Sequence, residues 1–282
     1  MTSKLSRTQQ IERQLGDWTR ARLPYGVAEL VMFTLKQGWA ALFGALMLLG
    51  IILSSQIWQE QWLIARYDAL LIYAISLQIL FLVTGLETWE EARVILLFHL
   101  TGTAMEIFKV NAGSWAYPEA SLLKLWGVPM FSGFMYASVG SYMARVIRLF
   151  DMRFSPYPPL WMSFALAGAV YINFFAHHFV TDIRLVLFVA TVVIFARTRV
   201  WFRIAERHYW MPLPLAAFFS SFALWIAENV GTRTKTWLYN GQTAQELVSF
   251  SKLGSWYLLL YVSFVTVTLV AREAIRSNKP QP

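Results

Sequence analysis

Cysteine is absent from this 282-residue chain, and charged residues make up only 14% of it. The absence of cysteine excludes a disulfide framework, a thiolate metal site and a cysteine nucleophile. Soluble domains carry about 25% charged residues. Because 57% of this chain is hydrophobic, it has more apolar surface than a soluble protein of its size can bury. The composition therefore predicts a polytopic membrane protein whose main partner is the lipid bilayer.

Signatures of several function classes are also missing. The sequence contains no Gly-rich phosphate loop, serine nucleophile elbow, kinase signature or nucleic-acid module. Its formal net charge is +8, but the basic residues are scattered between apolar runs. They are typical of segments that flank membrane helices, so we expect no nucleic-acid partner.

Eight apolar segments are each long enough to cross the roughly 30 Å hydrocarbon layer at about 1.5 Å per residue. We therefore predict an all-α polytopic membrane helix bundle with about eight transmembrane helices. The predicted spans are 37–57, 67–86, 92–111, 126–147, 158–178, 182–200, 212–230 and 253–272. Pro129 is expected to kink the fourth span. Residues 7–23 place Ile11, Leu15 and Trp18 on one helical face, which suits a helix lying on the membrane surface.

The distribution of basic residues predicts the orientation of the chain. With the N-terminus in the cytoplasm, 17 of the 24 Lys and Arg residues fall on the cytoplasmic side. Positive charge accumulates on that side of bacterial membranes. We expect a multi-pass protein with both termini cytoplasmic.

A segment of the chain occurs twice. Glu106 is followed by Trp115 and Tyr117, and Glu228 is followed by Trp237 and Tyr239 with the same spacing, at an offset of 122 residues. This predicts two parallel four-helix repeats, related by an axis along the membrane normal. The expected organisation is an N-terminal amphipathic segment at 1–24, a first half at 25–148, a second half at 149–276 and a polar tail at 277–282.

The paired glutamates are the predicted catalytic residues. An intramembrane carboxylate costs at least about 2.5 kcal/mol on insertion scales, so it usually faces a bundle interior or a watery cavity. His99 and Thr103 share the helical face of Glu106. The alternative for Glu106 is an interfacial ion pair with Lys109, one turn further on. Glu228 has no such neighbour, because the equivalent position is Gly231.

Aromatic and histidine residues complete the predicted substrate-binding set. Its members are expected near the ends of the odd-numbered spans: His99, Thr103, Trp115, Tyr117, His177, Trp237 and Tyr239. The tryptophans and tyrosines either line the mouth of a carboxylate cavity or belong to the aromatic belt at the membrane interface. His177, His178 and Asp182 raise the question of a metal, but adjacent histidines point about 100° apart on a helix. We expect no metal site, and the sequence names no cofactor.

The run from Glu106 to Glu119, Glu-Ile-Phe-Lys-Val-Asn-Ala-Gly-Ser-Trp-Ala-Tyr-Pro-Glu, resembles the YoaT-like family of bacterial integral membrane proteins, domain of unknown function 817. That resemblance covers most of the chain and implies a bacterial inner membrane location, without implying an activity. A membrane glutamate before a Gly- and Tyr-containing turn is also similar to the carotenoid hydratase-like membrane proteins, which act on a polyene double bond. Their pattern ends in Tyr-x-Tyr, whereas this chain has Trp115-Ala-Tyr117.

Three functions follow from these features. The first is a membrane-embedded enzyme that binds or modifies a lipid or isoprenoid through Glu106 and Glu228. The second is a secondary transporter in which the same glutamates couple to protons or cations. The third is a non-catalytic membrane organiser. The sequence does not specify the substrate or the oligomeric state.

Overall fold

Helices make up most of the described chain, in agreement with the predicted bundle. The structure is a computed structural model that describes residues 7–205, 207–269 and 271–276. The first six residues of the N-terminal segment and the predicted tail at 277–282 lie outside the described residues. Within the described ranges the chain forms α1 (Arg7–Arg22), α2 (Tyr25–Ala40), α3 (Leu42–Ile57), α4 (Arg66–Val83), α5 (Trp89–Asn111), α6 (Ser132–Leu149), α7 (Leu160–Ala176), α8 (Arg184–Phe195), α9 (Leu213–Arg233), α10 (Phe250–Thr268) and α11 (Glu273–Arg276).

Each segment predicted to span the membrane contains most of one helix, from α3 in the first to α10 in the last, but the first, at 37–57, also includes the end of α2 and the break at Ala41. Four of these helices, α4, α5, α9 and α10, are long and apolar enough to cross a bilayer. A fifth crossing results if α2 and α3, which meet at a bend of 68°, count as one broken span. Helices α7 and α8 are apolar but shorter. The chain is therefore a mostly helical protein with four to five candidate membrane spans, and the count of eight stays a prediction.

The predicted start of the fourth span is wrong. Instead of a helix from residue 126, the chain forms a hairpin of β2 (Lys124–Leu125) and β3 (Val128–Pro129), and α6 begins only at Ser132. Trp126 and Gly127 form the two-residue turn with φ values of 48° and 84°, as a type I′ turn requires. Pro129 therefore lies in a strand before the helix and does not kink it.

The all-α expectation also needs correction, because three small antiparallel sheets are present. Besides the hairpin, β1 (Trp115–Ala116) pairs with β7 (Leu238–Tyr239), and β4 (Arg153–Ser155), β5 (Arg199–Arg203) and β6 (His208–Pro212) form a three-stranded sheet. The predicted span 182–200 accordingly overruns its helix, since α8 ends at Phe195. In β5, exposed arginines alternate with buried Val200 and Phe202, which is the two-residue period of a strand.

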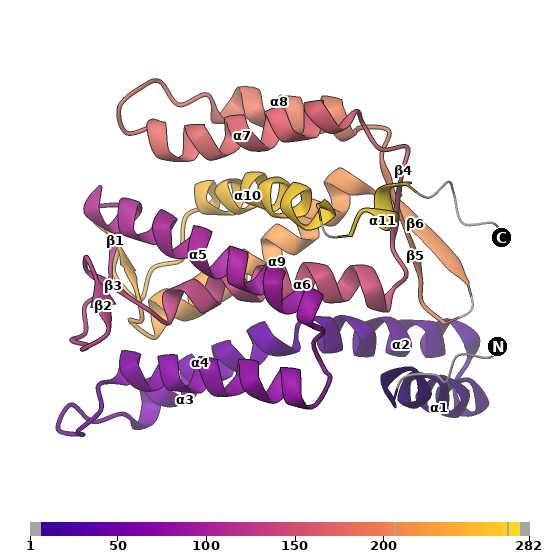
Figure 1. Cartoon of the computed structure of the whole chain (residues 1–282), viewed down its shortest axis with the longest axis horizontal. Helices are drawn as coiled ribbons and strands as arrows, with labels where there is room; N and C mark the ends of the chain where they lie inside the picture. Colours follow the sequence, from indigo (N-terminus) through magenta and orange to yellow (C-terminus); the bar gives the residue numbers. More distant parts are fainter. Residues whose placement is uncertain (1–6, 206, 270, 277–282) are drawn as a thin grey trace.

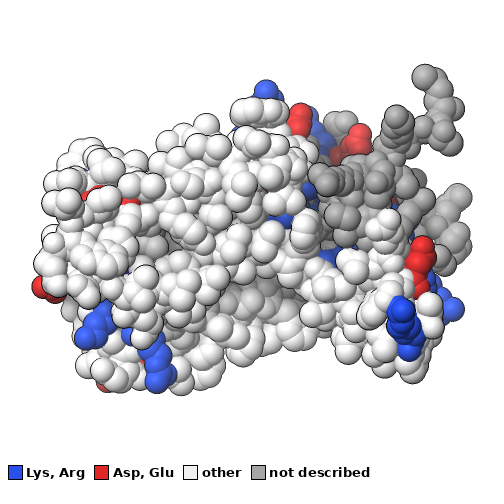
Figure 2. Space-filling model, turned by 90° about the horizontal axis from the view of Figure 1, so that it is seen from below, with Lys and Arg blue, Asp and Glu red and all other residues white. Residues whose placement is uncertain are grey.

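The helices run between two ends of the molecule that carry different sheets. In Figure 1, β1, β2 and β3 lie at one end of the long axis, and β4, β5, β6 and α1 lie at the other. We call these the hairpin end and the sheet end. Figure 2 shows, on one face, charged side chains toward both ends and a largely uncharged stretch between them. This distribution is the one that a membrane-crossing bundle requires.

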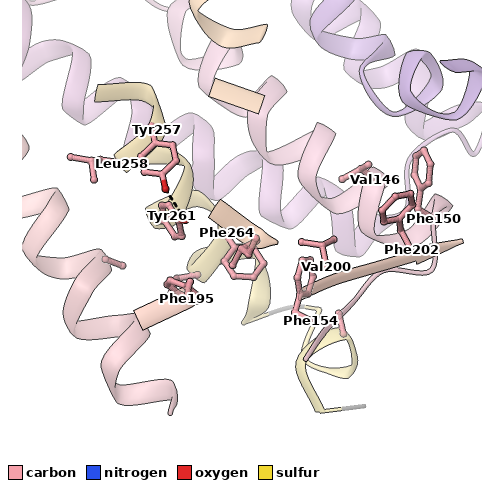
Figure 3. Close-up of a cluster of buried hydrophobic side chains, with 14 of the residues drawn as sticks. Val146, Phe150, Phe154, Phe195, Val200, Phe202, Tyr257, Leu258, Tyr261 and Phe264 are labelled. Atoms are coloured by element: carbon pink, nitrogen blue, oxygen red, sulfur yellow. Dashed lines mark hydrogen bonds between the residues drawn. The ribbon is translucent and has the colours of Figure 1, made fainter. Parts of the chain in front are cut away.

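Aromatic and aliphatic side chains form the core at the sheet end. Phe154 and Phe195 pack on Phe264 of α10, with ring centroids 4.7 and 6.2 Å apart. Phe150 at the end of α6 packs on Phe202 of β5 at 6.2 Å. Figure 3 shows this cluster, with Val200 and Phe202 of β5 on one side and Tyr257, Tyr261 and Phe264 of α10 on the other. The sheet thus closes the end of the bundle with apolar contacts.

Helices α5 and α6 approach each other closely through glycine. A Cβ built at Gly133 of α6 would overlap His99 and Thr103 of α5, and one built at Gly102 would overlap Tyr136. The sequence places Gly133, Ala137 and Ser141 four residues apart, a spacing that permits close helix packing in lipid. That contact fixes the position of Tyr136 relative to Glu106.

Candidate functional site

The carboxylate of Glu106 accepts three hydrogen bonds from neutral donors. Trp115 Nε1 and the Tyr117 hydroxyl each donate to Oε2 at 2.8 Å, and the Tyr136 hydroxyl donates to Oε1 at 2.7 Å. Glu106 itself is 3% exposed. A buried carboxyl group needs such partners, because an unsatisfied polar group in an apolar interior is costly.

Glu228 has the same two principal donors in the second copy of the segment. Trp237 Nε1 donates to its Oε2 at 3.0 Å, and the Tyr239 hydroxyl donates to the same oxygen at 2.6 Å. The Trp256 side chain of α10 interacts with this carboxylate as well. The predicted Glu, Trp and Tyr spacing therefore describes one hydrogen-bonded unit that occurs twice.

The backbone explains why the spacing has this result. After α5, Gly113 adopts a φ of 72°, and the amide of Ser114 donates to the Lys109 carbonyl at 2.9 Å. After α9, Lys235 adopts a φ of 55°, and the amide of Thr236 donates to the Gly231 carbonyl at 2.9 Å. This left-handed C-terminal turn reverses the chain, so each Trp-x-Tyr segment folds back on the glutamate of its own helix.

The two units meet through their strands. Trp115 pairs with Tyr239, and Ala116 pairs with Leu238, in the antiparallel β1–β7 ladder. Each strand thus contacts the equivalent segment of the other copy, as in a two-fold self-complementary contact. Burial raises the pKa of the Tyr117 and Tyr239 phenols well above the usual range, and the nearby glutamates add to the rise. Both hydroxyls therefore stay protonated and donate.

A single cavity of about 660 Å³ is lined by both glutamates. Its wall includes the four aromatic donors Trp115, Tyr117, Trp237 and Tyr239, together with His177 after α7. Helices α2 and α3 also line it around the bend at Ala41. The volume lies within the range of small-molecule sites. The structure therefore brings seven of the predicted site residues to one cavity.

Two predicted substrate-binding residues lie outside the cavity lining. His99 and Thr103 point into the α5–α6 contact at Gly133, and the His99 ring packs on Phe134 with centroids 4.5 Å apart. His99 Nδ1 and Thr103 Oγ1 are buried without a hydrogen-bond partner among the described residues.

His178 and Asp182, at the hairpin end, contact neighbouring polar side chains. His178 Nε2 lies 3.1 Å from Lys109 Nζ, so Lys109 is turned toward α7. Asp182 accepts from Asn173 Nδ2 at 3.0 Å and pairs with Arg184 at 3.1 Å. No group of three His, Asp or Glu side chains suited to a metal ion occurs in the part of the chain that the structure describes.

Three contributors to the site were missed by the sequence analysis. Tyr136 donates to Glu106 from α6, while Lys252 and Trp256 reach the Glu228 side of the cavity from α10. Tyr136 and Trp256 do not stand at equivalent positions of the two copies, so the repeat did not point to them. Lys252 belongs to no repeated motif in the sequence.

Comparison with known proteins places the chain in a family. A family model described as "Protein of unknown function (DUF817)" matches residues 29–264. The chain belongs to this family. The uncharacterized protein YoaT of Bacillus subtilis (strain 168) is 40% identical over 242 residues, which cover 86% of this chain and 91% of YoaT. No solved structure matches the chain. The resemblance to the DUF817 family is thus confirmed, while that to carotenoid hydratase-like proteins stays a prediction.

Proposed function

We propose that this DUF817 protein is a membrane-embedded enzyme that binds and modifies a lipid or isoprenoid, using Glu106 and Glu228 as an acid and base pair. One observation carries the proposal: both carboxylates line the same cavity, and each is held by a Trp and a Tyr donor. A positioned carboxyl group in an apolar site can protonate a double bond, and its partner can stabilise or deprotonate the resulting cation.

The aromatic lining supports this chemistry. The Trp115 and Tyr239 rings lie 5.8 Å apart, and the Tyr136 and Trp256 rings lie 6.0 Å apart, all on the wall of the cavity. Aromatic faces attract cations, with estimates of about 2 kcal/mol at desolvated sites. The cavity therefore combines a proton source, a carboxylate and surfaces for a carbocation-like intermediate.

The proposed membrane topology has eight crossings, from α3 to α10, with the sheet end and both termini in the cytoplasm. The basic residues of the loops at that end support this orientation. The two halves are proposed to be parallel repeats, supported by their equivalent C-terminal turns and the β1–β7 pairing. The site would then lie where the halves meet, near the outer face of the bacterial inner membrane.

The test compares cellular lipids of a deletion strain with strains expressing wild type, Glu106→Gln or Glu228→Gln. Glutamine keeps the size and can still accept from Trp and Tyr, but it cannot donate a proton as a carboxylic acid does. We expect the deletion to change a lipid or isoprenoid species and neither variant to restore it. Restoration by both variants would exclude the proposed chemistry.

Proton- or cation-coupled transport is the second candidate, and the broken span favours it. Helices α2 and α3 meet at 68° beside Ala41, which lines the cavity. Interrupted helices at a binding site are typical of secondary transporters. In reconstituted vesicles, transport predicts substrate flux driven by an imposed pH gradient and lost in Glu106→Gln. Product formation without such flux would favour the enzyme.

A further inference from the structure

A second cavity, of about 470 Å³, adjoins the first toward the sheet end. The two cavities share five lining residues, Gln37, Tyr142, Ser220, Ala223 and Leu260. At this waist the Tyr142 hydroxyl donates to Gln37 Oε1 at 3.0 Å. We call the cavity with the glutamates the head chamber and the second cavity the tail chamber.

The tail chamber is almost entirely hydrocarbon beyond the waist. Its wall is formed by residues such as Val146, Phe154, Val200, Phe202 and Phe264, which belong to the cluster drawn in Figure 3. Water gains little in such a space, because an apolar cavity offers it no hydrogen-bond partners. The chamber therefore suits an alkyl or isoprenoid chain.

The head chamber contains cations without matching ion pairs. Lys109 is 2% exposed, and its ammonium group lies 4.1 Å from the Phe174 ring and 3.1 Å from His178 Nε2. The Lys252 ammonium lies 4.1 Å from the Tyr239 ring. Among the described residues, the ion pairs within 4 Å include neither lysine.

An anionic group between these lysines would offset the cost of holding ammonium ions away from water. Lys109 and Lys252 are within electrostatic reach of each other and of Arg184, and all three line the head chamber. Asp182 pairs with Arg184, and Glu228 lies near Lys252. Of the three cations, Lys109 is the one whose charge is least compensated by these two acidic residues.

We infer that the ligand is a single-chain amphiphile with an anionic headgroup. The headgroup binds at Lys109 and Lys252, and the chain passes Tyr142 into the tail chamber, which limits its length. This inference rests on the proposed lipid-binding function. From Ser251 in the head chamber to Phe264 in the tail chamber, α10 rises by about 20 Å at about 1.5 Å per residue. A single long chain matches the length of this path.

Binding to the purified full-length protein in detergent tests the inference. The probes are octanoate and palmitate for carboxylates, geranyl and geranylgeranyl phosphate for phosphates, and the matching alcohols as neutral controls. Wild type should bind each long-chain anion at least about tenfold more tightly than its short-chain counterpart, because each buried methylene contributes about 0.8 kcal/mol. The series that binds more tightly shows whether the headgroup is a carboxylate or a phosphate.

Filling the tail chamber should remove the preference for long chains. Ala217 of α9 lines the tail chamber, whereas the neighbouring Phe218 is 45% exposed and does not. Ala217→Trp should reduce long-chain binding about tenfold and leave short-chain binding unchanged. Phe218→Trp is the matched control and should bind like wild type. If Ala217→Trp does not fold, Ala217→Leu takes its place. Leucine adds less volume, so this variant should reduce long-chain binding to a smaller extent.

The outcomes separate the inference from the proposed function. If wild type binds long chains but Ala217→Trp and Ala217→Leu keep the long-chain preference, the tail chamber does not hold the chain. If alcohols bind as tightly as the anions, or if Lys109→Gln leaves anion binding unchanged, the headgroup assignment is overturned. If wild type binds none of the probes, the lipid-binding function itself fails.

Discussion

The sites around Glu106 and Glu228 have the same hydrogen-bond frame but different charged neighbours. Each glutamate accepts from a Trp and a Tyr in its own copy of the segment. Glu106 has a third neutral donor in Tyr136, whereas Glu228 has, besides the Trp256 side chain, the ammonium group of Lys252 within electrostatic reach. A nearby ammonium stabilises the negative charge of a carboxylate. We therefore assign the acid role to Glu106 and the base role to Glu228.

The two sites also differ in the burial of their tryptophans, and the residue three positions after each glutamate accounts for this difference. At the first site this residue is Lys109, and the ring of Trp115 is partly exposed. At the second site it is Gly231, and the Trp237 ring lies against its backbone, 7% exposed. Equivalent sequence spacing thus produces one indole beside a cation and one buried on a glycine. The comparison shows that two copies of one hydrogen-bond frame have different surroundings.

Gly231→Ala should have the largest effect on the second site. A Cβ at this position would overlap the Trp237 indole, so the ring would move away from Glu228. Overpacking of this kind costs about 2–3 kcal/mol, which should appear as a lower melting temperature in detergent and as loss of ligand binding. Gly168→Ala is the matched control, because open space surrounds a Cβ there. An unchanged Gly231→Ala protein would contradict the packing described here.

Tyr239→Phe should be more damaging than Tyr117→Phe. Removal of Tyr239 leaves Glu228 with Trp237 at 3.0 Å and the contact of the Trp256 side chain, while Glu106 without Tyr117 keeps both Trp115 at 2.8 Å and Tyr136 at 2.7 Å. We expect the free energy of unfolding to fall by about 1–2 kcal/mol for Tyr239→Phe and by about half of that for Tyr117→Phe. Thermal unfolding of the two variants side by side measures the difference. Equal losses would show that Tyr136 does not compensate.

Lys252→Gln should change the reactivity of Glu228 several-fold. Dicyclohexylcarbodiimide modifies protonated carboxyl groups in apolar surroundings, and mass spectrometry locates the product. In wild type we expect more modification at Glu106 than at Glu228, and Lys252→Gln should increase modification at Glu228. Lys109→Gln is the control at the first site, since Lys109 contacts His178. Preferential labelling of Glu228 in wild type would reverse the assigned roles.

The Tyr117 and Tyr239 phenols should titrate alike. Their removal should give the smallest change among these predictions. The pKa values of Tyr117 and Tyr239 are raised well above 10.0, mainly by burial. Stability from the neutral phenols is therefore complete below pH 10 and is lost only as the pH rises toward the raised values. Alkaline absorbance titration should show no tyrosinate difference between wild type and the Tyr117→Phe, Tyr239→Phe double variant near pH 10. A difference equal to two ordinary tyrosines would contradict the burial.

The grouping of each glutamate with a Trp and a Tyr was predictable from the sequence because it is local and repeated, but the hydrogen bonds between them were not, since the aromatics could equally belong to the membrane interface. Trp115 and Tyr117 follow Glu106 across one helix terminus, so the spacing alone indicated that they belong together. Tyr136 and Lys252 come from other helices and do not occupy equivalent positions, and only tertiary packing brings them to the site.

The helices were predictable because long apolar runs favour them in lipid, but their ends were not. Hydropathy does not distinguish a helix from the strand at Val128 or from β5, both of which carry apolar side chains. The bend between α2 and α3 also escaped prediction, since Ala41 is neither proline nor glycine. On one side of the bend, Lys36 of α2 donates hydrogen bonds to the carbonyls of Arg203 and Ile204 at the sheet end, and the sequence gives no sign of this long-range contact.

For the proposed function, the β1–β7 pairing bears on the route by which a ligand would enter the cavity. Parting these strands would break backbone hydrogen bonds and pull Trp115 and Tyr239 away from the glutamates. Small residues of α3 and α9, including Gly44, Ala45 and Ala223, border the same cavity without a strand ladder between them. For the proposed lipid-binding function, we therefore expect a hydrophobic ligand to reach the cavity from the bilayer core, between α3 and α9.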